Sequence, residues 1–579
     1  MPISIPRTWG QILSLIAFAG LLLLEGCVLG HQPGSGQQQQ IVVTVSASVS
    51  VPAQIPVSTS TQASTIQFSA SVQGTSNQAV TWSLNPDTSS ACSGTSLGAI
   101  SSVGLYTAAT EINGAPCDVV VTATSNEDNV TTGQARVREL IVVTITPATD
   151  TIGQGGNLQY SAVVTGAPNT AQGQAVQWSA SGGGAFDNPS NNAGLYIAPP
   201  LPGGTTSEIA TISATSQFDS TQSASATLTI QETDPLGTVS NVQTLSSCPA
   251  DSNGGLANGT CYSLTVSCDQ VADMTTYVKV NAPPKGATLA GTVLFLIGSG
   301  GNGLYDSNPT WQYGYLAVEN VYAANFNTVQ VSFGAPFSSN NPNGWLRGPG
   351  GVRRLACRFA TVADWVYNNP KTINPNATAA NSAPMCGTAN SGGSGALAYA
   401  VYQYGLAGTN TTGPTQEFNM IEPTSGPPMT RLDQACVCNN QAMGNPDPCS
   451  GSVRSPMCFS PSEADIIDPA YQTAGQTSPT LCSQGLTGSN NAQANRFASD
   501  SIDYQPNNTI AIPLSKTLLV NMRFGGLDTT TAVPQGETWF GAVAPRPGTP
   551  ACTQDAPHDL PDVQDGATDI ATDIITNCK

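Results

Sequence analysis

Short runs rich in Val, Thr, Ile and Ser fill residues 41–231, where apolar and polar positions alternate between Gly, Asn and Pro turns. Alternation with a period of two predicts strands that bury one face, and many such short strands are typical of small antiparallel sandwiches. The pattern occurs twice, so we predict two tandem domains, at residues 41–139 and 140–232. The matching blocks are IVVTV (41–45) with IVVTI (141–145), AVTWS (79–83) with AVQWS (175–179), and GLYTA (104–108) with GLYIA (194–198).

From residue 233 onward the pattern changes to apolar strands that alternate with amphipathic helices. TVLFLIG at 292–298 is typical of a buried strand, and apolar residues recur at three- and four-residue spacing from Val352 to Val366, as on one face of a helix. Strands that alternate with helices predict a mainly parallel sheet with helices on both faces. We therefore expect an α/β domain over residues 233–579, with its chemistry at the carboxyl ends of the strands.

Trp82 and Trp178 stand at matching positions of the two repeats and are expected to anchor the core of each sandwich. The Trp-Ser strand and the later Gly-Leu-Tyr strand resemble those of bacterial Ig-like domains of group 2. This resemblance covers both repeats and implies two all-β Ig-like domains that act as spacers. Binding of glycan by exposed Tyr or Trp residues is the alternative role.

Composition and charge narrow the class of partner. The chain has 579 residues, of which 39% are apolar and only 9% are charged. This length exceeds one compact core, so several domains are expected. The 36 acidic residues outnumber the 17 basic ones and give a net charge of -19. Because such a charge repels phosphate backbones, binding of nucleic acid is not expected.

Residues 1–27 have the order of an export signal: a basic residue, an apolar stretch and then Cys27. Leu24-Glu25-Gly26-Cys27 resembles the bacterial lipobox, although Glu25 stands where a small or apolar residue is usual. The resemblance implies lipid attachment at Cys27 and a membrane anchor, with ordinary signal cleavage or an uncleaved anchor as alternatives. Residues 28–40 are rich in Gly, Ser and Gln and are expected to form a flexible tether. We therefore expect an extracytoplasmic bacterial protein, either a cell-envelope lipoprotein or secreted.

The cysteine count fits this location. Without Cys27, 14 of the 15 cysteines remain, an even number that implies up to seven disulfides in an exported chain. Cys92–Cys117 is expected to form because these two cysteines stand alone in their stretch. The other pairings do not follow from the sequence, and Cys248–Cys261 and Cys357–Cys386 are the ones that we consider first. Zinc is not expected, because the chain has only two histidines and no paired short cysteine spacing of the zinc type.

The segment CGTANSGGSGA at 386–396 resembles the nucleophile elbow of α/β-hydrolases, with Ala389 in place of the first Gly of G-x-S-x-G. The strand-to-helix turn at such an elbow is tight, so it requires small residues two positions before and two positions after the serine. Ala389 and Gly393 meet this requirement for Ser391, the predicted nucleophile. Ser394 is flanked by small residues in the same way and is the alternative nucleophile. The interpretation without catalysis is that this segment is a plain Gly/Ser loop.

The same resemblance implies an acid after a late strand and a histidine near the C-terminus, in that order. Asp528 follows the strand-like run TLLVNMRF at 517–524, and His558 comes further along the chain. A serine hydroxyl needs a base to take its proton, and a carboxylate must orient that base. His558 is the only histidine outside the tether, so we predict it as base and Asp528 as acid. The competing acids are Asp555, Asp559 and Asp562.

A glycine-rich loop, Gly298 to Gly303, follows the predicted strand at 292–298, where this family carries the loop of its oxyanion hole. The resemblance implies one backbone donor from Gly300 or Gly301 and a second from Gly392, each lowering the barrier by about 2.7–4 kcal/mol. Residues 422–515 take the place of a cap over the site. They hold five cysteines and little periodic structure, so disulfides are expected to fix this cap.

Together these features predict an extracytoplasmic serine hydrolase, similar to carboxylesterases and lipases, that acts through an acyl-serine intermediate on a small or polymeric ester. No cofactor and no metal is expected. The alternative from another class is a non-catalytic cell-surface binding protein or adhesin, in which the Ig-like domains bind and the hydrolase fold is inactive. The complete Ser-Asp-His set argues against this alternative, because loss of activity normally removes one of its members.

Overall fold

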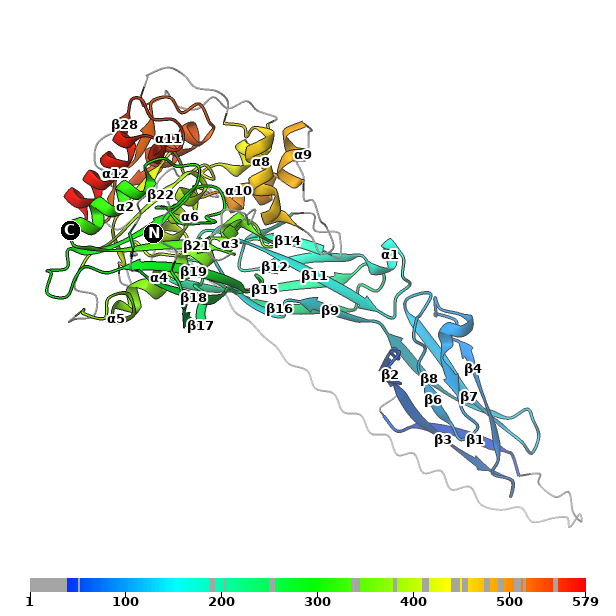
Figure 1. Ribbon diagram of the computed structural model, residues 1–579. Helices are drawn as coiled ribbons and strands as arrows, with labels where there is room; N and C mark the ends of the chain where they lie inside the picture. The colour runs from blue at the N-terminus through cyan, green and yellow to red at the C-terminus, as the bar shows by residue number, and fades with distance from the viewer. Residues whose placement is uncertain are drawn as a thin grey trace, which may run out of the picture.

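The computed structural model of the chain is elongated, with two sandwiches of strands in line and a larger α/β part at one end (Figure 1). The predicted signal, with Cys27, and most of the predicted tether lie outside the described residues. In the described part, no helix is long and apolar enough to cross a bilayer. The structure describes residues 39–579 apart from 50–52, 188–192, 202–204, 249–255, 258, 335–336, 338–343, 378–382, 409–415, 439–447, 450–456, 473–479, 488–493, 504–511, 514–516 and 545–549.

The first sandwich consists of two four-stranded sheets that share one core. Its strands alternate between buried and exposed residues, as the period of two predicts. Cys92–Cys117 joins the loop before this sandwich's β5 to β7, in agreement with the expected pairing. One sheet has the order β1 (Val42–Ala47), β3 (Thr65–Gln73), β6 (Leu105–Thr107), β5 (Ala99–Ile100), and the other β2 (Ala53–Pro56), β8 (Thr132–Leu140), β7 (Cys117–Ser125), β4 (Val80–Pro86).

The second sandwich repeats this arrangement with two more four-stranded sheets. In both sandwiches one short strand pairs in parallel with the last strand, β2 with β8 and β10 with β16, and the other pairs are antiparallel. One sheet has the order β10 (Thr149–Gly153), β16 (Ser223–Gln231), β15 (Ser207–Ser216), β12 (Val176–Ser181), and the other β13 (Ala185–Asp187), β14 (Ala193–Ile197), β11 (Asn157–Thr165), β9 (Val142–Thr146).

The repeated tryptophan and glycine motifs pack against each other in both sandwiches. A Cβ at Gly194 would lie 2.8 Å from Nε1 of Trp178, and a Cβ at Gly104 would lie 2.9 Å from Cζ2 of Trp82. Only glycine therefore lets the Gly-Leu-Tyr strand approach the indole this closely. Trp178 is buried in the core as predicted, whereas Trp82 is only partly buried against it.

The α/β part is built on a ten-stranded sheet. The strands β17, β18, β19 and β21 pair antiparallel, and from β21 through β20 to β28 all pairs are parallel. The sheet order is β17 (Thr238–Thr244), β18 (Thr260–Ser267), β19 (Met274–Asn281), β21 (Phe326–Phe333), β20 (Gly291–Leu296), β22 (Met385–Asn390), β23 (Phe418–Thr424), β26 (Arg523–Gly525), β28 (Ala551–Thr553), with β25 (Leu519–Val520) paired to β23.

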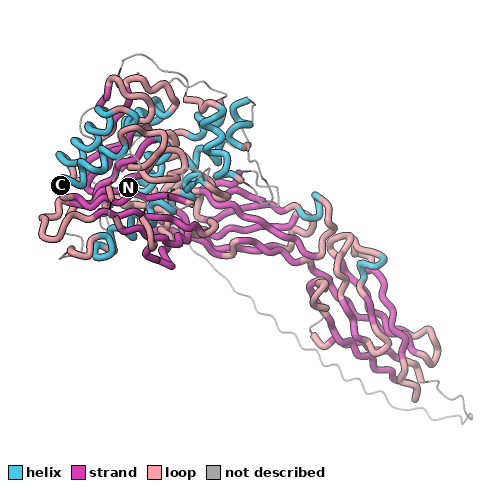
Figure 2. The backbone as a smooth tube through the Cα atoms, in the orientation of Figure 1, coloured by secondary structure: helices cyan, strands magenta, loops and turns pink. Residues whose placement is uncertain are grey.

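Helices cover both faces of this sheet, as Figure 2 shows. Leu294 and Leu296 of β20 belong to the core under α4 (Cys357–Asn368), α6 (Ser391–Tyr402) and α11 (Ala532–Ala542). The alternate residues Val293 and Phe295 belong to the core under α2 (Gly314–Ala323) and α12 (Gln564–Asn577). The central strand is therefore buried on both sides, which explains its continuous apolar sequence.

Two predicted elements are divided in the structure. The helix predicted from Val352 to Val366 is formed by α3 (Val352–Leu355) and α4, and its apolar face is buried. The run TLLVNMRF at 517–524, predicted as one strand, forms two short strands, β25 and β26, which pair with β23 at different points. Between them, Asn521 donates its backbone N–H to the carbonyl of Ile421 at 2.9 Å.

Seven disulfides join the cysteines of the described residues. Cys248–Cys261 is present as we first considered it. Cys357–Cys386 is wrong, because Cys357 binds Cys268 and Cys386 binds Cys578. Cys357 lies in the core under α4, whereas Cys386 lies in the core under α12, so the sheet separates them. The three other bridges are Cys436–Cys482, Cys438–Cys458 and Cys449–Cys552.

The segment between β23 and β25 forms short helices, where the sequence shows little periodicity. Two disulfides lie within this segment, and Cys449–Cys552 ties it to β28. We call the described residues of this segment the cap. Its helices are α7 (Leu432–Cys436), α8 (Pro461–Ile467), η3 (Asp468–Tyr471), α9 (Leu481–Thr487) and α10 (Ala494–Asp500).

The second sandwich contacts the α/β part through buried polar groups. Asn157 of β11 donates its side-chain amide to Asp500 of the cap at 2.7 Å. Arg353 of α3 binds Asp234 at 2.6 Å and also donates to the carbonyl of Gln154 in the sandwich at 3.1 Å. These bonds fix the second sandwich to α3 and to α10 of the cap.

Candidate active site

Ser391 lies at the turn between β22 and α6, where the sequence predicts the nucleophile elbow. Its φ angle is +48°, a left-handed conformation that is uncommon for residues other than glycine. The next residue must be glycine here, because a Cβ at Gly392 would lie 2.2 Å from the carbonyl oxygen of Ser299. This strained turn lifts Ser391 out of the sheet, and its side chain lines a cavity.

Ser394, the alternative nucleophile, has a different environment. It is fully buried on α6, and its hydroxyl donates to the backbone carbonyl of Ser391. A Cβ at Gly426 would meet its Oγ, so this hydroxyl is enclosed by backbone. Ser394 is not among the cavity-lining residues, whereas Ser391 is. The geometry therefore favours Ser391 over Ser394.

Asp528 and His558 are in direct contact. Nδ1 of His558 lies 2.9 Å from Oδ2 of Asp528, whose side chain is fully buried, while 27% of the His558 side chain is exposed. The second carboxylate oxygen accepts two bonds from Thr530, from its N–H at 2.9 Å and from its hydroxyl at 2.8 Å. The hydroxyl of Thr530 is also 3.0 Å from Nδ1 of His558. The carboxylate is thus fixed by Thr530 and bonded to Nδ1, and the imidazole, whose other nitrogen is Nε2, lines the cavity.

The competing acids lie elsewhere. Asp559 accepts a hydrogen bond from the side chain of Asn390 at 2.7 Å, and Asp555 is exposed. Asp562 donates its backbone N–H to Asp559 within a short 3-10 turn, η5 (Leu560–Asp562). Among the described residues, Asp528 is the one carboxylate that contacts the His558 ring.

The pair has the electrostatics of an oriented base. Burial alone would raise the pKa of Asp528, but hydrogen bonds and charge from His558 and the bonds from Thr530 hold this pKa below its ordinary value of 3.8. Burial lowers the pKa of His558, and the hydrogen bond and charge of Asp528, with the charges of Asp559 and Glu463, more than offset this effect. The pKa of His558 therefore lies above its ordinary value of 6.5. Asp528 stays ionised while the imidazole gains basicity, as a general base requires.

The glycine-rich loop after β20 runs beside Ser391. Gly298, Ser299 and Gly392 line the same cavity as Ser391, and a Cβ at Gly298 would lie 3.4 Å from the Ser391 Cβ. Gly301, one of the predicted donors, gives its N–H to the carbonyl of Gly298 at 3.0 Å. The N–H of Trp345 donates to the carbonyl of Gly300 at 2.8 Å, so the predicted Gly300 and Gly301 form the turn that holds the loop in place.

Buried polar side chains of β19 and β21 anchor this loop. Nζ of Lys279, on β19, lies 2.7 Å from Oδ2 of Asp306, and both side chains are almost fully buried. Gln330 of β21 also donates to this carboxylate and accepts the backbone N–H of Asp306, both at 2.9 Å. Gly303 gives its N–H to the hydroxyl of Ser332 at 2.9 Å. The loop is thus fixed at its far end, beyond the residues that lie beside Ser391.

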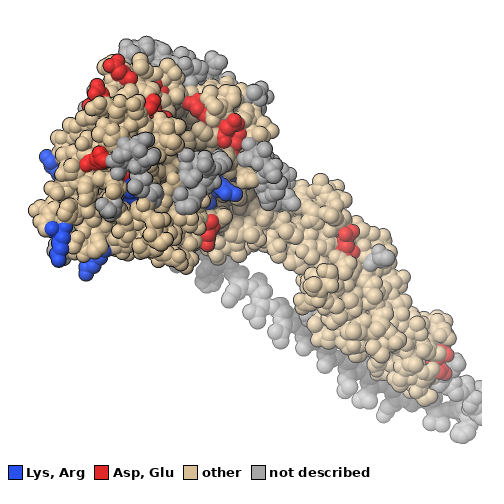
Figure 3. Space-filling view, in the orientation of Figure 1, with Lys and Arg blue, Asp and Glu red and all other residues tan. Residues whose placement is uncertain are grey.

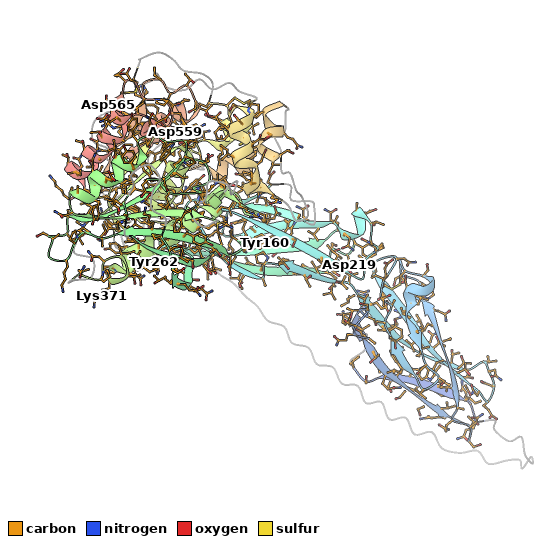
Figure 4. The ribbon with its side chains drawn as sticks, viewed as in Figure 1. Tyr160, Asp219, Tyr262, Lys371, Asp559 and Asp565 are labelled. Carbon is orange, nitrogen blue, oxygen red and sulfur yellow. A yellow bond between two sulfur atoms is a disulfide. The ribbon has the colours of Figure 1, made fainter. Side chains whose placement is uncertain are left out.

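The cavity has a volume of about 360 Å³ and lies between this loop, the elbow, the His558 loop and the cap. Trp311 lines it from the loop after β20, and Phe459 and Ile466 line it from the cap. Figure 4 labels Asp559, which lies in the α/β part on the side away from the first sandwich. Charged side chains are sparse on the visible surface of the molecule, as Figure 3 shows. Among the described residues, no group of three or more His, Cys, Asp or Glu side chains is arranged to hold a metal ion.

The sequence does not single out several residues that the structure brings to the site. Thr530 holds the acid, and Asn390 joins the elbow to Asp559. Glu463 of α8 accepts the N–H of Thr531 at 3.2 Å and its hydroxyl at 2.6 Å. Ser460 and Glu463 form a capping box, and their spacing is a signal that marks the start of α8. That signal identifies the helix but not the contact with Thr531.

Comparisons with known proteins give partial similarities. No protein-family model matches the chain, and no curated protein matches it. A solved putative hydrolase from Agrobacterium vitis is 11% identical, covers 56% of this chain and 100% of its own, and has a TM-score of 0.33. Est1E from Butyrivibrio proteoclasticus, with ferulic acid bound, is 8% identical over 54% of this chain and 98% of its own, with a TM-score of 0.31. The mouse alpha/beta hydrolase domain-containing protein 10 is 9% identical over 54% of this chain and 96% of its own, with a TM-score of 0.30.

Proposed function

We propose that the α/β part is a serine hydrolase with Ser391 as nucleophile, His558 as general base and Asp528 as the acid that orients it. The observation that carries this proposal is the convergence of three segments far apart in the chain. Ser391, at a left-handed elbow, lines one cavity with His558, whose Nδ1 lies 2.9 Å from Asp528. A buried carboxylate, an imidazole with raised pKa and a serine at a strained turn are the parts that acyl transfer needs.

In the first half of the proposed reaction, Nε2 of His558 takes the hydroxyl proton as Ser391 Oγ attacks the carbonyl carbon of an ester. The imidazolium then gives that proton to the leaving alcohol, and the acyl group remains on Oγ. The negative charge on the tetrahedral intermediate needs backbone donors at the elbow. We propose the N–H groups of Gly392 and Ser299, because both residues line the cavity beside Ser391, whereas the N–H of Gly301 is already bonded to Gly298.

In the second half, His558 takes a proton from water, and the resulting hydroxide attacks the acyl-serine. The imidazolium returns the proton to Oγ, and the carboxylic acid leaves. Asp528 stays ionised throughout, because hydrogen bonds and charge hold its pKa below the ordinary value. Carboxylic esters are the proposed substrates, because an amide demands stronger protonation of its leaving group.

The proposed location is extracytoplasmic. Seven disulfides in the described residues are typical of a chain that folds in an oxidising compartment. The two sandwiches are proposed as Ig-like spacers that hold the α/β part away from a lipid anchor at Cys27. Their repeated glycine-on-tryptophan packing supports a common origin of the two domains.

Labelling with a fluorophosphonate probe tests this proposal. The full, oxidised chain is treated with the probe beside Ser391→Ala, Ser394→Ala and His558→Ala variants. We expect labelling of the unaltered chain and of Ser394→Ala, and loss of labelling in the other two. Circular dichroism and the thermal midpoint show whether each variant is folded. A folded chain that does not react with the probe, or that reacts equally well without Ser391, would refute the assignment.

A further inference from the structure

The cavity beside Ser391 has a largely apolar wall. Met429, Phe459, Ile466 and Ile467 come from the cap, and Trp311 comes from the loop after β20. These residues are buried or half-buried around a volume of about 360 Å³. Since a water molecule occupies about 30 Å³, this space holds a group of roughly a dozen non-hydrogen atoms. In the acyl-serine intermediate the acyl group stays attached to Ser391, so it is the acyl part that must fit this wall.

Two carboxylates also line the cavity, Glu463 from α8 and Asp559 from the loop of His558. Their positions are fixed by neutral donors. Oε2 of Glu463 accepts the N–H and the hydroxyl of Ser460, both at 2.7 Å, and Oε1 accepts the two donors of Thr531. Oδ1 of Asp559 accepts the side-chain amide of Asn390. Neither carboxylate is bound to a lysine or arginine among the ion pairs of the described residues.

These carboxylates act on whatever enters the cavity. No lysine or arginine is among the described residues that line it, so His558 is the one lining side chain there that can become cationic. The charges of Glu463 and Asp559 are both felt at the imidazole of His558, where they favour its protonated form. A negative group on a substrate would meet the same two charges in a cavity with a largely apolar wall, where repulsion is stronger than in bulk solvent.

We propose that this site, provided that it is the serine hydrolase described above, selects esters with an uncharged and mainly apolar acyl group and excludes anionic acyl groups through Glu463 and Asp559. The apolar wall favours binding of the chosen group, and the two carboxylates disfavour its charged competitors. Specificity then comes from attraction and repulsion together. Esters of dicarboxylic acids with a free carboxylate are the excluded class.

Three para-nitrophenyl esters with one leaving group separate charge from polarity and size. The heptanoate is neutral and apolar, the methyl adipate is neutral and polar, and the adipate carries a free carboxylate at the same place. We expect kcat/KM of the full, oxidised chain to be at least about tenfold lower for the adipate than for the methyl adipate at low ionic strength. The ratio of these two values is the readout, because it is independent of losses common to both esters.

Glu463→Gln and Asp559→Asn remove one negative charge each from the cavity. In either variant we expect the ratio of adipate to methyl adipate to rise severalfold, even where the absolute rates fall. Asp465→Asn is the matched control, because Asp465 is an exposed carboxylate on the same helix that does not line the cavity. Using both variants keeps the test valid if one of them fails to fold.

The outcomes separate the two proposals. Equal turnover of adipate and methyl adipate, or an equal rise of the ratio in Asp465→Asn, would overturn the proposed selectivity and leave the hydrolase assignment standing. Turnover of no ester, with no labelling of Ser391 by the fluorophosphonate probe, would overturn the proposed function and with it the selectivity. A low ratio that rises in Glu463→Gln or Asp559→Asn alone supports both.

Discussion

Replacing Asp528 by Asn tests the proposed triad with little change in shape. The Asn side-chain oxygen can keep the two donors of Thr530, which bind Oδ1 of the carboxylate at 2.9 and 2.8 Å. The side-chain amide then faces Nδ1 of His558, now 2.9 Å from Oδ2. Because an amide donates, Nδ1 must become the acceptor, and the imidazole proton moves to Nε2, which can no longer accept the proton of Ser391.

The expected loss follows from this change of tautomer. A wrong tautomer with an intact site lowers kcat about 10⁴-fold, equivalent to about 5 kcal/mol in the barrier. The variant should also lose the largest influence that raises the pKa of His558, namely the hydrogen bond and charge of Asp528. In the unaltered chain, activity falls as the pH drops through this pKa, above 6.5. In Asp528→Asn, the fall of the residual activity should occur at a lower pH than in the unaltered chain, because the pKa of His558 is lower.

Steady-state hydrolysis of para-nitrophenyl heptanoate between about pH 5 and 9 measures both effects, because this range spans the ordinary pKa of histidine. Asp555→Asn and Asp562→Asn are the controls, since both acids were candidates in the sequence and neither contacts the imidazole in the described residues. We expect these two variants to keep most of the activity. A variant at Asp528 that loses less than about tenfold in kcat, or a control that loses as much as Asp528→Asn, would refute the assignment of the acid.

Three further predictions concern the acid loop and the stability of the α/β part. Thr530→Val removes a hydroxyl bonded to the acid and near the imidazole, so kcat should fall about tenfold with little change in KM, measured by steady-state kinetics. Burial, with a neighbouring carboxyl, raises the pKa of Glu417 from 4.5 to about 9, so the native state loses stability as the pH rises from about 4.5 to about 9. In urea unfolding, Glu417→Gln should therefore raise the free energy of unfolding by about 3 kcal/mol at pH 7 and leave it unchanged at pH 4. Replacing Cys449 and Cys552 by Ala opens a bridge across 103 residues between the cap and β28 and should cost about 2–5 kcal/mol, seen as a lower thermal midpoint, and reduce kcat as well.

Sequence periodicity predicts the regular parts of this fold because their signals are local. The alternation in the sandwiches and the apolar face from Val352 to Val366 both correspond to buried faces in the structure. The elbow around Ser391 is predicted for the same reason, since the tight turn needs small residues at fixed offsets. The run at 517–524 misleads because a strand of a sheet is defined by its neighbours. Its apolar residues are spread over β25, β26 and the two residues between them, and both strands pair with β23.

The disulfides follow from the placement of the sheet rather than from spacing. Cys92–Cys117 is predictable because no other cysteine is near in the chain. Cys386–Cys578 joins residues 192 positions apart, and it forms because α12 packs on the face of β22 that carries Cys386. Nothing local in the sequence indicates which face of the sheet a cysteine will occupy when the strand is buried on both sides.

The residues that surround the triad escape sequence reasoning for a related physical cause. Asn390 and Asp559 are 169 positions apart, and Glu463 and Thr531 are 68 apart. A single polar contact between residues this far apart produces no periodic pattern and no bias of composition in the sequence, although it fixes the position of side chains at the site. Glu463 is the clearest case, because one carboxylate begins α8, holds the segment of Thr531 next to the acid loop and lines the cavity. We therefore expect Glu463→Gln to change substrate choice and also to lower the pKa of His558, the second by a small amount, because the charge of Glu463 is the smallest of the influences that raise this pKa. The pH dependence of kcat/KM measures both effects.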